Sequence, residues 1–476
     1  MLIIESDLKR QLSLVKFLLQ EGGVISLKKL SQLIESSART CENDLIQISR
    51  LLPTGWEVYQ VGKGMWKLSK PANENYFHIY GIFFKKSITF QLITNAFQFP
   101  KKNFFRMCES IFVSRAHLYK KIVAFNQLLP EQINFNARSM DFEGNEFYVR
   151  LLFWIAMTLV PDMKFWNISQ EFILDGYEKT KKIEDCFNLH FSIISRKSFV
   201  LWLEICTRRQ RKHPISDIPI DISESIYNFW GAEHISILKS FSEAYTNVNE
   251  RHALIAGLYL NAQLPVTDQH LAEYIGYYKL NNSTRYQISS NIVKKMRPNS
   301  ECLYQQLVVR IIDLQISLPI ICFLEHFDIF RFYKPQDKFE KDIKKRIASI
   351  VEEICTHYGD KEKNDFTNVL FWIFHEVLPI FFFKKIKIHI YNRQKLIAQT
   401  YLKHRIESEL GELVEVYTEL KNESLNSMDI IITDGMISID EMATYKKVHV
   451  ICWNDPPLNS DWECLKDSVH AITNDI

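Results

Sequence analysis

Residues 27–52 read LKKLSQLIESSARTCENDLIQISRLL, and their apolar spacing indicates two short helices joined by a turn. Apolar residues recur every three to four positions in residues 26–35, which predicts a short amphipathic helix. The pattern breaks at Ser36-Ser37, and a serine hydroxyl readily accepts hydrogen bonds from the free N–H groups at a helix start. We therefore expect Ser37 to cap a further helix. Its buried side should carry Ala38, Cys41, Leu45, Ile48 and Leu52.

The polar residues of this helix gather in its first turn and a half. A recognition helix has this arrangement, because its first residues reach base edges in the major groove of DNA. An amphipathic helix at residues 8–19 precedes it. A β-hairpin with strands at 56–61 and 65–68 and a Gly62-Lys63-Gly64 tip follows it. The pattern predicts a winged helix-turn-helix, with Ser37, Arg39, Thr40, Asn43 and Lys63 as its DNA contacts.

The same arrangement recurs in residues 86–146. Helices are expected at 86–99 and 103–112, and the next helix opens with Val113-Ser114-Arg115. Strands at 133–135 and 140–142 predict a second wing. The buried stripe of the last helix should be Leu118, Ile122, Phe125 and Leu129. The expected DNA contacts are Ser114, Arg115, His117, Tyr119, Lys120 and Lys121.

Either copy alone is also compatible with a plain helical bundle whose charged residues are merely solvated. Two tandem copies in the more basic part of the chain favour double-stranded DNA as the partner. Residues 1–150 carry 20 Lys and Arg against 13 Asp and Glu, whereas the whole chain of 476 residues has a net charge of only +2. A cationic surface attracts polyanions.

The amino-acid composition and the absence of certain motifs exclude several other classes of protein. A chain of 476 residues with 47% hydrophobic and 24% charged residues is expected to form several globular domains. The nine cysteines form no CxxC pair, so neither a metal site nor a disulfide framework is expected, and a reducing cytoplasm fits. No signal peptide is visible, and the apolar stretch at 369–383 is too short to span a membrane. No nucleotide-binding, metalloprotease or hydrolase motif occurs, so we expect neither an enzyme nor a cofactor.

The order of these modules resembles the Mga/AtxA-like virulence transcription regulators of Gram-positive bacteria. The resemblance rests on the two helix-turn-helix segments at 27–52 and 104–129, and on residues 143–150 running into the apolar Leu151-Leu-Phe-Trp154. It implies a mainly α multidomain chain. The expected domains are two winged helices at 1–75 and 76–165, two helical PTS-regulation (PRD-like) domains at 166–282 and 283–385, and an EIIB-like α/β domain at 386–476.

Between residues 166 and 385, apolar residues recur at helical spacing. This predicts helices at 198–207, 235–245, 251–260, 303–318 and 339–355. The resemblance implies that histidines there accept phosphate from a sugar-transport phosphocarrier protein. The candidates are His190, His213, His252, His326 and His375. The sequence departs from the family where a histidine is expected shortly before Phe199, because Ser195-Arg196-Lys197 stands there.

From residue 386 onward the spacing of apolar residues changes from helical to a mixture of strand and helix patterns. Residues 386–391 alternate as a strand, 396–410 are helical, and 413–417, 430–433 and 448–453 predict further strands, which implies a small parallel sheet. This resembles the EIIB domain of sugar phosphotransferase enzymes, which places a cysteine in the loop after its first strand. Here the loop is Asn392-Arg-Gln-Lys395, so we expect a dimerisation or sensing role without catalysis.

We therefore expect a cytoplasmic DNA-binding regulator that forms a homodimer or larger oligomer. An RNA-binding antiterminator with PRD domains is the main alternative, although such proteins carry a short β-rich head. A phosphotransfer enzyme component is a third possibility, which the loop at 392–395 argues against.

Overall fold

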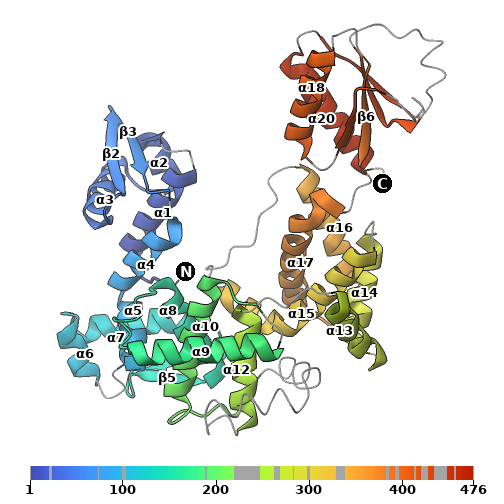
Figure 1. The fold of residues 1–476 in the computed structure, drawn as a ribbon. Helices are drawn as coiled ribbons and strands as arrows, with labels where there is room; N and C mark the ends of the chain where they lie inside the picture. Colours follow the sequence, from blue (N-terminus) through green and yellow to red (C-terminus); the bar gives the residue numbers. More distant parts are fainter. Residues whose placement is uncertain are drawn as a thin grey trace. The chain divides into compact units, whose positions relative to one another are not determined.

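The computed structural model is mostly helical, with two β-hairpin regions and one small parallel sheet (Figure 1). It divides into two compact bodies: residues 1–265 with 316–331, and residues 266–315 with 332–476. The five finer domain boundaries expected from the sequence stay predictions. The residues described are 2–20, 24–72, 74–98, 103–187, 190–218, 247–261, 268–281, 283–296, 301–327, 338–381, 385–391, 396–411, 414–419, 427–433, 448–454 and 457–474.

The first winged helix is built from three helices and a three-stranded antiparallel sheet of order β1-β3-β2. Leu30, Cys41, Leu45, Ile48 and Trp66 contribute buried side chains to its core. Ala38 is exposed, because it follows the cap directly and lies on the outer side of the helix start. Its elements are α1 (Ser6–Gln20), β1 (Val24–Ser26), α2 (Leu27–Leu33), α3 (Ala38–Leu51), β2 (Glu57–Gly62) and β3 (Met65–Ser69).

The second winged helix has the expected helix-turn-helix and two-stranded wing. The helix expected at 86–99 is really the second of two, because the chain turns at Ser87. The Ser87 hydroxyl donates to the carbonyl of Phe84 and accepts from the N–H of Phe90, so it ends one helix and starts the next. The elements are α4 (Tyr76–Lys86), α5 (Ile88–Gln98), α6 (Phe104–Ser110), α7 (Arg115–Asn126), β4 (Ile133–Asn136) and β5 (Asp141–Gly144).

Helix α8 (Glu146–Leu159) follows directly and is buried on nearly every side. It packs against α4 and α5 of the second winged helix and against α10 (Ile193–Arg209) of the helical region that follows. Burying one large apolar side chain stabilises a fold by about 1.5–3 kcal/mol, so this helix joins the two regions firmly. Helix α9 (Gln170–Phe187) packs against α10.

Helix α12 (Val248–Asn261) lies beside α10 at a close approach. A Cβ atom added at Gly257 would lie 2.2 Å from the ring of Trp202, so only glycine fits there. The indole N–H of Trp202 donates to the carbonyl of Ala253 at 2.9 Å. The helices expected at 198–207 and 251–260 are confirmed, and the one expected at 235–245 falls outside the described residues.

The second body begins with further helices: α13 (Asp268–Leu280), α14 (Thr284–Met296), α16 (Lys338–Ile354) and α17 (Asp360–Phe381). The long helix α15 (Glu301–His326) contributes its first part to this body and its last part to the first body. Among the described helices it is the one long and apolar enough to cross a membrane, but two thirds of its apolar window, 67%, is buried within protein. Burial of this kind is typical of a core helix.

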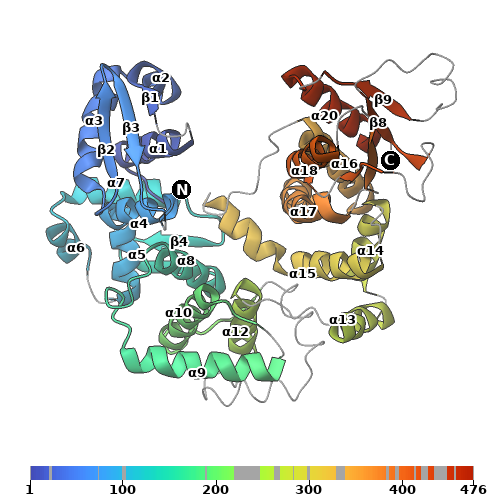
Figure 2. The same ribbon diagram turned by 45° about the horizontal axis from the view of Figure 1, so that its top comes forward.

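The C-terminal region is a parallel sheet of order β7-β6-β8-β9 with helices on one side (Figure 2). Ile386, Ile388 and Ile390 share one face of the central strand and pack with Leu402 and Leu465 from the two helices. The predicted strand and helix pattern is confirmed, and the loop at 392–395 falls outside the described residues. The elements are β6 (Ile386–Tyr391), α18 (Leu396–Leu410), β7 (Val414–Tyr417), β8 (Ile430–Thr433), β9 (His449–Cys452) and α20 (Asn459–Asn474).

Candidate nucleic-acid interface

The two expected recognition helices begin with the same capping arrangement. The Ser37 hydroxyl accepts from the N–H of Thr40 at 3.1 Å, and the Ser114 hydroxyl accepts from the N–H of His117 at 3.2 Å. Each cap satisfies one of the N–H groups that lack a partner within the helix. The two serines therefore fix where α3 and α7 begin.

The turns that precede these caps are also alike. Glu35 and Phe112 each have a φ of 55°, in the left-handed region that side-chain-bearing residues rarely adopt. The next N–H in each turn reaches back to the preceding helix, from Ser36 to the carbonyl of Ser31 at 3.0 Å and from Val113 to that of Cys108 at 3.1 Å. The duplication expected from the sequence therefore extends to the backbone.

The first winged helix presents only part of its expected contact set to solvent. Arg39, Asn43 and Lys63 are exposed, whereas Thr40 is half-buried and its hydroxyl lies 2.8 Å from that of Ser37. Thr40 therefore supports the cap as well as facing outward.

A partly buried ion pair holds the first recognition helix in place, and the sequence reasoning missed it. Asp44 of α3 is buried and accepts two hydrogen bonds from the Arg10 guanidinium of α1. Hydrogen bonding to Asp44 raises the pKa of Arg10 further. The amide of Gln11 also donates to Asp44, at 3.2 Å. Helix α3 is thereby fastened to α1 along its inner side.

The second recognition helix presents more positive charge. Arg115, His117, Tyr119 and Lys120 are exposed, and Lys121 is half-buried. The Arg115 guanidinium lies over the ring of Phe105 from α6, 4.0 Å from its centroid. A cation–π contact of this kind restricts the side chain while leaving its charge available.

Two features of the second wing also escaped the sequence reasoning. Asn126, the last residue of α7, donates to the carbonyl of Phe135 at 2.9 Å and accepts from its N–H at 2.7 Å, which clamps the recognition helix to β4. Arg138 is exposed at the wing tip, between β4 and β5, where the first wing has Lys63. The signal for Arg138 was a basic residue in the short tip between two alternating strands.

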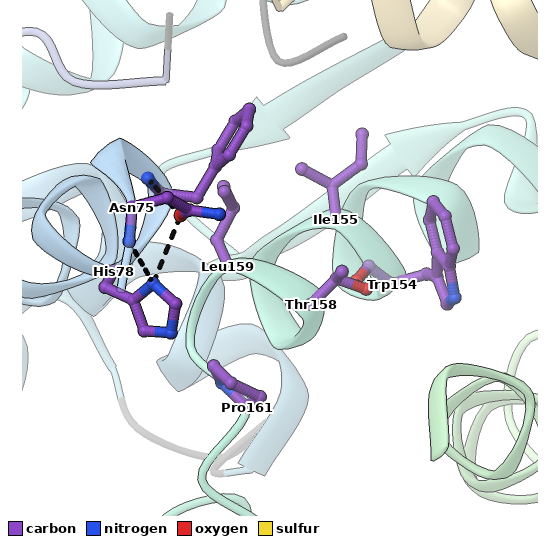
Figure 3. A pocket seen from close by; sticks show the side chains of 8 residues that line it. Asn75, His78, Trp154, Ile155, Thr158, Leu159 and Pro161 are labelled. Carbon is purple, nitrogen blue, oxygen red and sulfur yellow. Dashed lines mark hydrogen bonds between the residues drawn. The ribbon is translucent and has the colours of Figure 1, made fainter. Parts of the chain in front are cut away.

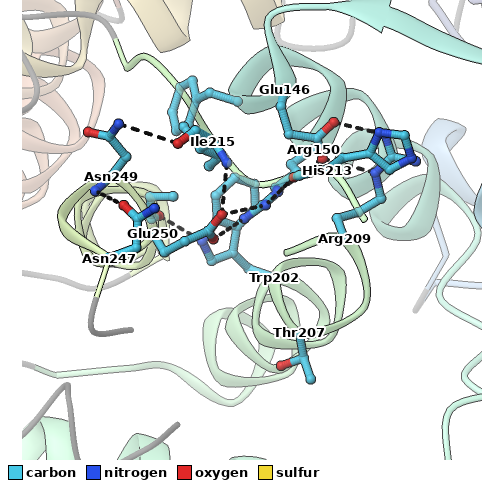
Figure 4. A network of polar contacts seen from close by, with 12 residues as sticks. Glu146, Arg150, Trp202, Thr207, Arg209, His213, Ile215, Asn247, Asn249 and Glu250 are labelled. Carbon is cyan, nitrogen blue, oxygen red and sulfur yellow. Dashed lines mark hydrogen bonds and ion pairs between the residues drawn. The ribbon is translucent and has the colours of Figure 1, made fainter. Parts of the chain in front are cut away.

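A network of charged groups joins the second winged helix to the helical region behind it (Figure 4). Arg150 of α8 is fully buried and donates to both carboxylate oxygens of Glu250 on α12, at 2.6 and 2.9 Å. Arg150 also donates to Glu146 at 3.1 Å and to the carbonyl of His213 at 3.0 Å. Arg209 of α10 pairs with Glu146 at 2.8 Å.

The same network reaches the second wing. Arg209 lies 3.3 Å from Asp141 on β5, and the Nε2 atom of His213 lies 3.4 Å from that carboxylate. A charge buried without its partner is costly, so these groups are expected to keep their pairing in the folded protein.

The candidate phosphate-accepting histidines are scattered. His190 is exposed, with Nδ1 3.9 Å from Glu184, while Arg196 donates to the same carboxylate at 2.7 Å. His326 is exposed at the end of α15, with Nε2 2.8 Å from the carbonyl of Leu128, just beyond α7. His252 is buried on α12. The side chain of His375, on α17, falls outside the described residues.

A largely apolar cavity of about 290 Å³ lies between α4 and α8 (Figure 3). Asn75 and His78 line it from the start of α4, where the N–H of Asn75 donates to Nδ1 of His78 at 3.1 Å. Trp154, Ile155 and Leu159 line it from α8.

Among the described residues, no group of three or more His, Cys, Asp or Glu side chains is placed to hold a metal ion. All nine cysteines are free.

Comparison with known proteins agrees with this architecture. Residues 73–155, which run from just before α4 into α8, match the Mga helix-turn-helix domain family. Over 94% of its length the chain is 22% identical to the "anthrax toxin expression trans-acting positive regulator" of Bacillus anthracis, 98% of which is covered. It is 23% identical to the "capsule synthesis positive regulator AcpA" of the same organism, over 61% of each chain. These matches confirm the resemblance to the Mga/AtxA-like regulators that the sequence predicted.

Proposed function

We propose that the chain is a transcription regulator that binds promoter DNA through its two winged helices, with the second supplying most of the affinity. The observation that carries this proposal is the cationic start of α7, where Arg115 and Lys120 are exposed beside a capped helix end. A helix presented in this way fits the major groove. The relatives named as positive regulators support the same role.

The residues of the proposed interface fall into three groups by role. Ser37 and Ser114 fix the helix starts, and their hydroxyls are already engaged with backbone N–H groups. Arg39, Asn43, Arg115 and the exposed His117 and Tyr119 face the bases or the backbone. Lys63, Lys120, Lys121 and Arg138 would contact phosphates, together with the outer part of Thr40.

The decisive experiment removes the positive charge of α7. A variant carrying Arg115→Ala, Lys120→Ala and Lys121→Ala should bind duplex DNA more weakly. Its affinity should also depend less steeply on salt, because each lost phosphate contact lowers the slope of log K against log salt by about one. The matched control carries Lys181→Ala, Lys182→Ala and Lys197→Ala, three exposed cations outside both winged helices.

The control should bind as the wild type does. Unchanged affinity of the Arg115 variant at low salt would show that α7 is not the DNA-binding helix. A matched RNA duplex and hairpin belong in the same series, since stronger binding to RNA would favour an antiterminator.

We further propose that phosphate from a sugar-transport phosphocarrier regulates this binding, in a protein that acts as a dimer or larger oligomer in the cytoplasm. Two of the five candidate histidines contact the second winged helix: His213 at Asp141 of the wing, and His326 at the carbonyl of Leu128. A phosphoryl group adds about −1.5 to −2 charges at pH 7, which would repel Asp141 and displace either contact.

This regulation is tested by incubating the full chain with a phosphorylated phosphocarrier protein and measuring acid-labile label and DNA affinity. Label should disappear in the His213→Ala, His326→Ala double variant. It should persist when the exposed His357 and His404 are replaced. Undiminished labelling of the double variant would exclude these two histidines as the acceptors.

A further inference from the structure

Phe112 lies in the turn of the second helix-turn-helix, and its exposure is unusual. The residue is 95% exposed, the highest value among the large exposed hydrophobic residues of the described part of the chain. Its φ of 55° is a left-handed conformation that is disfavoured for a bulky side chain. Water is an unfavourable environment for a phenyl ring, so this position combines two unfavourable features.

The turn requires the backbone conformation but not the ring. In the first winged helix Glu35 adopts the same φ, within the same pattern of hydrogen bonds between the turn and the preceding helix. Glycine would satisfy both turns without strain. The phenyl ring of Phe112 therefore does nothing for the fold that glycine would not do as well.

The location of Phe112 indicates what the ring contacts. It stands two residues before the Ser114 cap and three before Arg115, at the end of α7 that presents its polar residues to solvent. A recognition helix approaches the major groove with this end. The apolar group displayed there is the C5-methyl group of thymine, which phenylalanine can contact directly.

We propose that the Phe112 ring packs against a thymine methyl group in the major groove and makes the second winged helix select thymine at one position of its site. The inference rests on the proposed DNA-binding function. Glu35 stands at the same place in the first winged helix, and its carboxylate offers no apolar surface to a methyl group. The two copies should thus differ in sequence selectivity at this position.

The experiment replaces thymine by uracil, which lacks the methyl group. A duplex is first selected from a random-sequence pool by the full chain, and each thymine is then replaced singly by uracil. The wild type should lose roughly fourfold in affinity at one position, the effect expected for a single buried methyl group. The Phe112→Gly variant should bind the thymine duplex more weakly and no longer distinguish the two bases there.

The glycine variant also separates lost contact from lost folding. Because glycine suits the turn, the unfolding midpoint of Phe112→Gly should be no lower than that of the wild type. The matched control, Glu35→Gly, changes the equivalent turn and should keep the discrimination between thymine and uracil.

Two results would overturn the inference while leaving DNA binding intact. One is that Phe112→Gly keeps the wild-type sensitivity to uracil at every position. The other is that the variant changes only the oligomeric state in sedimentation, which would assign the ring to a contact with a second copy of the chain. Failure of the full chain to select any duplex would instead refute the proposed function itself.

Discussion

At the residue scale, His252 shows how burial decides what a histidine can do. It lies on α12 with 8% of its surface exposed. Burial lowers the pKa of its imidazole, and the neighbouring charge of Arg251 lowers it further. A phosphocarrier protein would need access to the ring, so His252 is a poorer acceptor than the exposed His190 or His326.

The same burial predicts a loss of stability in acid. An unfolded histidine takes up a proton near pH 6.5, whereas folded His252 resists protonation until the pH is lower. The unfolded state therefore gains protons first, and the free energy of unfolding falls as the pH drops below about 6.5. This one group contributes at most about 1.4 kcal/mol per pH unit.

Chemical denaturation between pH 7.5 and 5.5 tests this prediction. The variant His252→Gln should lose less stability over this range than the wild type. The control His190→Gln replaces an exposed histidine and should follow the wild type. Parallel curves for the wild type and His252→Gln would show that His252 titrates normally in the folded chain.

Single residues also show where reasoning from the sequence stops. Ser37 and Ser114 were predictable as caps, because a cap acts on N–H groups a few residues away. Asp44 was not predictable as a buried residue, because its partner Arg10 lies 34 positions earlier and the two look like ordinary surface charges in the sequence. Phe112 reads as one more apolar position until the turn geometry shows its exposure.

At the scale of elements, α8 depends on a partner from a distant helix. Arg150 has no exposed side-chain surface, and its strongest contact is with Glu250 of α12. Removing one member of a buried pair costs about 3–5 kcal/mol, because the other charge stays buried and loses most of its compensation. The variant Glu250→Gln should therefore be strongly destabilised.

Unfolding in denaturant, followed by tryptophan fluorescence, measures this cost. The control is Glu353→Gln, which breaks an exposed pair between α14 and α16 with two bonds of 2.8 Å from Lys295. Exposed pairs contribute about 0–1 kcal/mol, so this control should be nearly neutral. Equal effects of the two substitutions would mean that Arg150 is solvated in the folded protein.

Helices and strands were largely predictable where apolar residues recur at one spacing, either that of a helix or that of a strand. Helices α3 and α7, both wings and the strands of the C-terminal sheet follow from apolar spacing and from turn residues. Helix α4 was not anticipated, because its run of tyrosine and phenylalanine residues is buried on several sides and shows no polar face. The break at Ser87 depends on a hydroxyl that bonds in both directions.

At the scale of the whole molecule, the part of the chain that carries the two winged helices makes many of its contacts with later residues. Helix α8 closes the second winged helix, yet it packs against α10 and bonds to α12. Tyr148 of α8 also lies against Phe323 of α15, with ring centroids 5.0 Å apart. These contacts join α8, and with it the second winged helix, to residues far along the chain.

A fragment of residues 1–165 should therefore be unstable, although it contains both winged helices. It would leave Arg150 without Glu250 and expose the outer face of α8. We expect fast hydrogen exchange in α8 and aggregation of the fragment, and slow exchange there in the full chain. A monomeric fragment with slow exchange in α8 would contradict this expectation.

The pairing of Arg150 with Glu250 also sets an order of events during synthesis. The two residues are separated by 100 positions. At about 5–20 residues per second, a ribosome adds the second one several seconds or more after the first. In that interval Arg150 of α8 lacks the Glu250 carboxylate that it pairs with in the folded protein. The nascent second winged helix therefore stays incomplete, and accessible to chaperones, until α12 emerges.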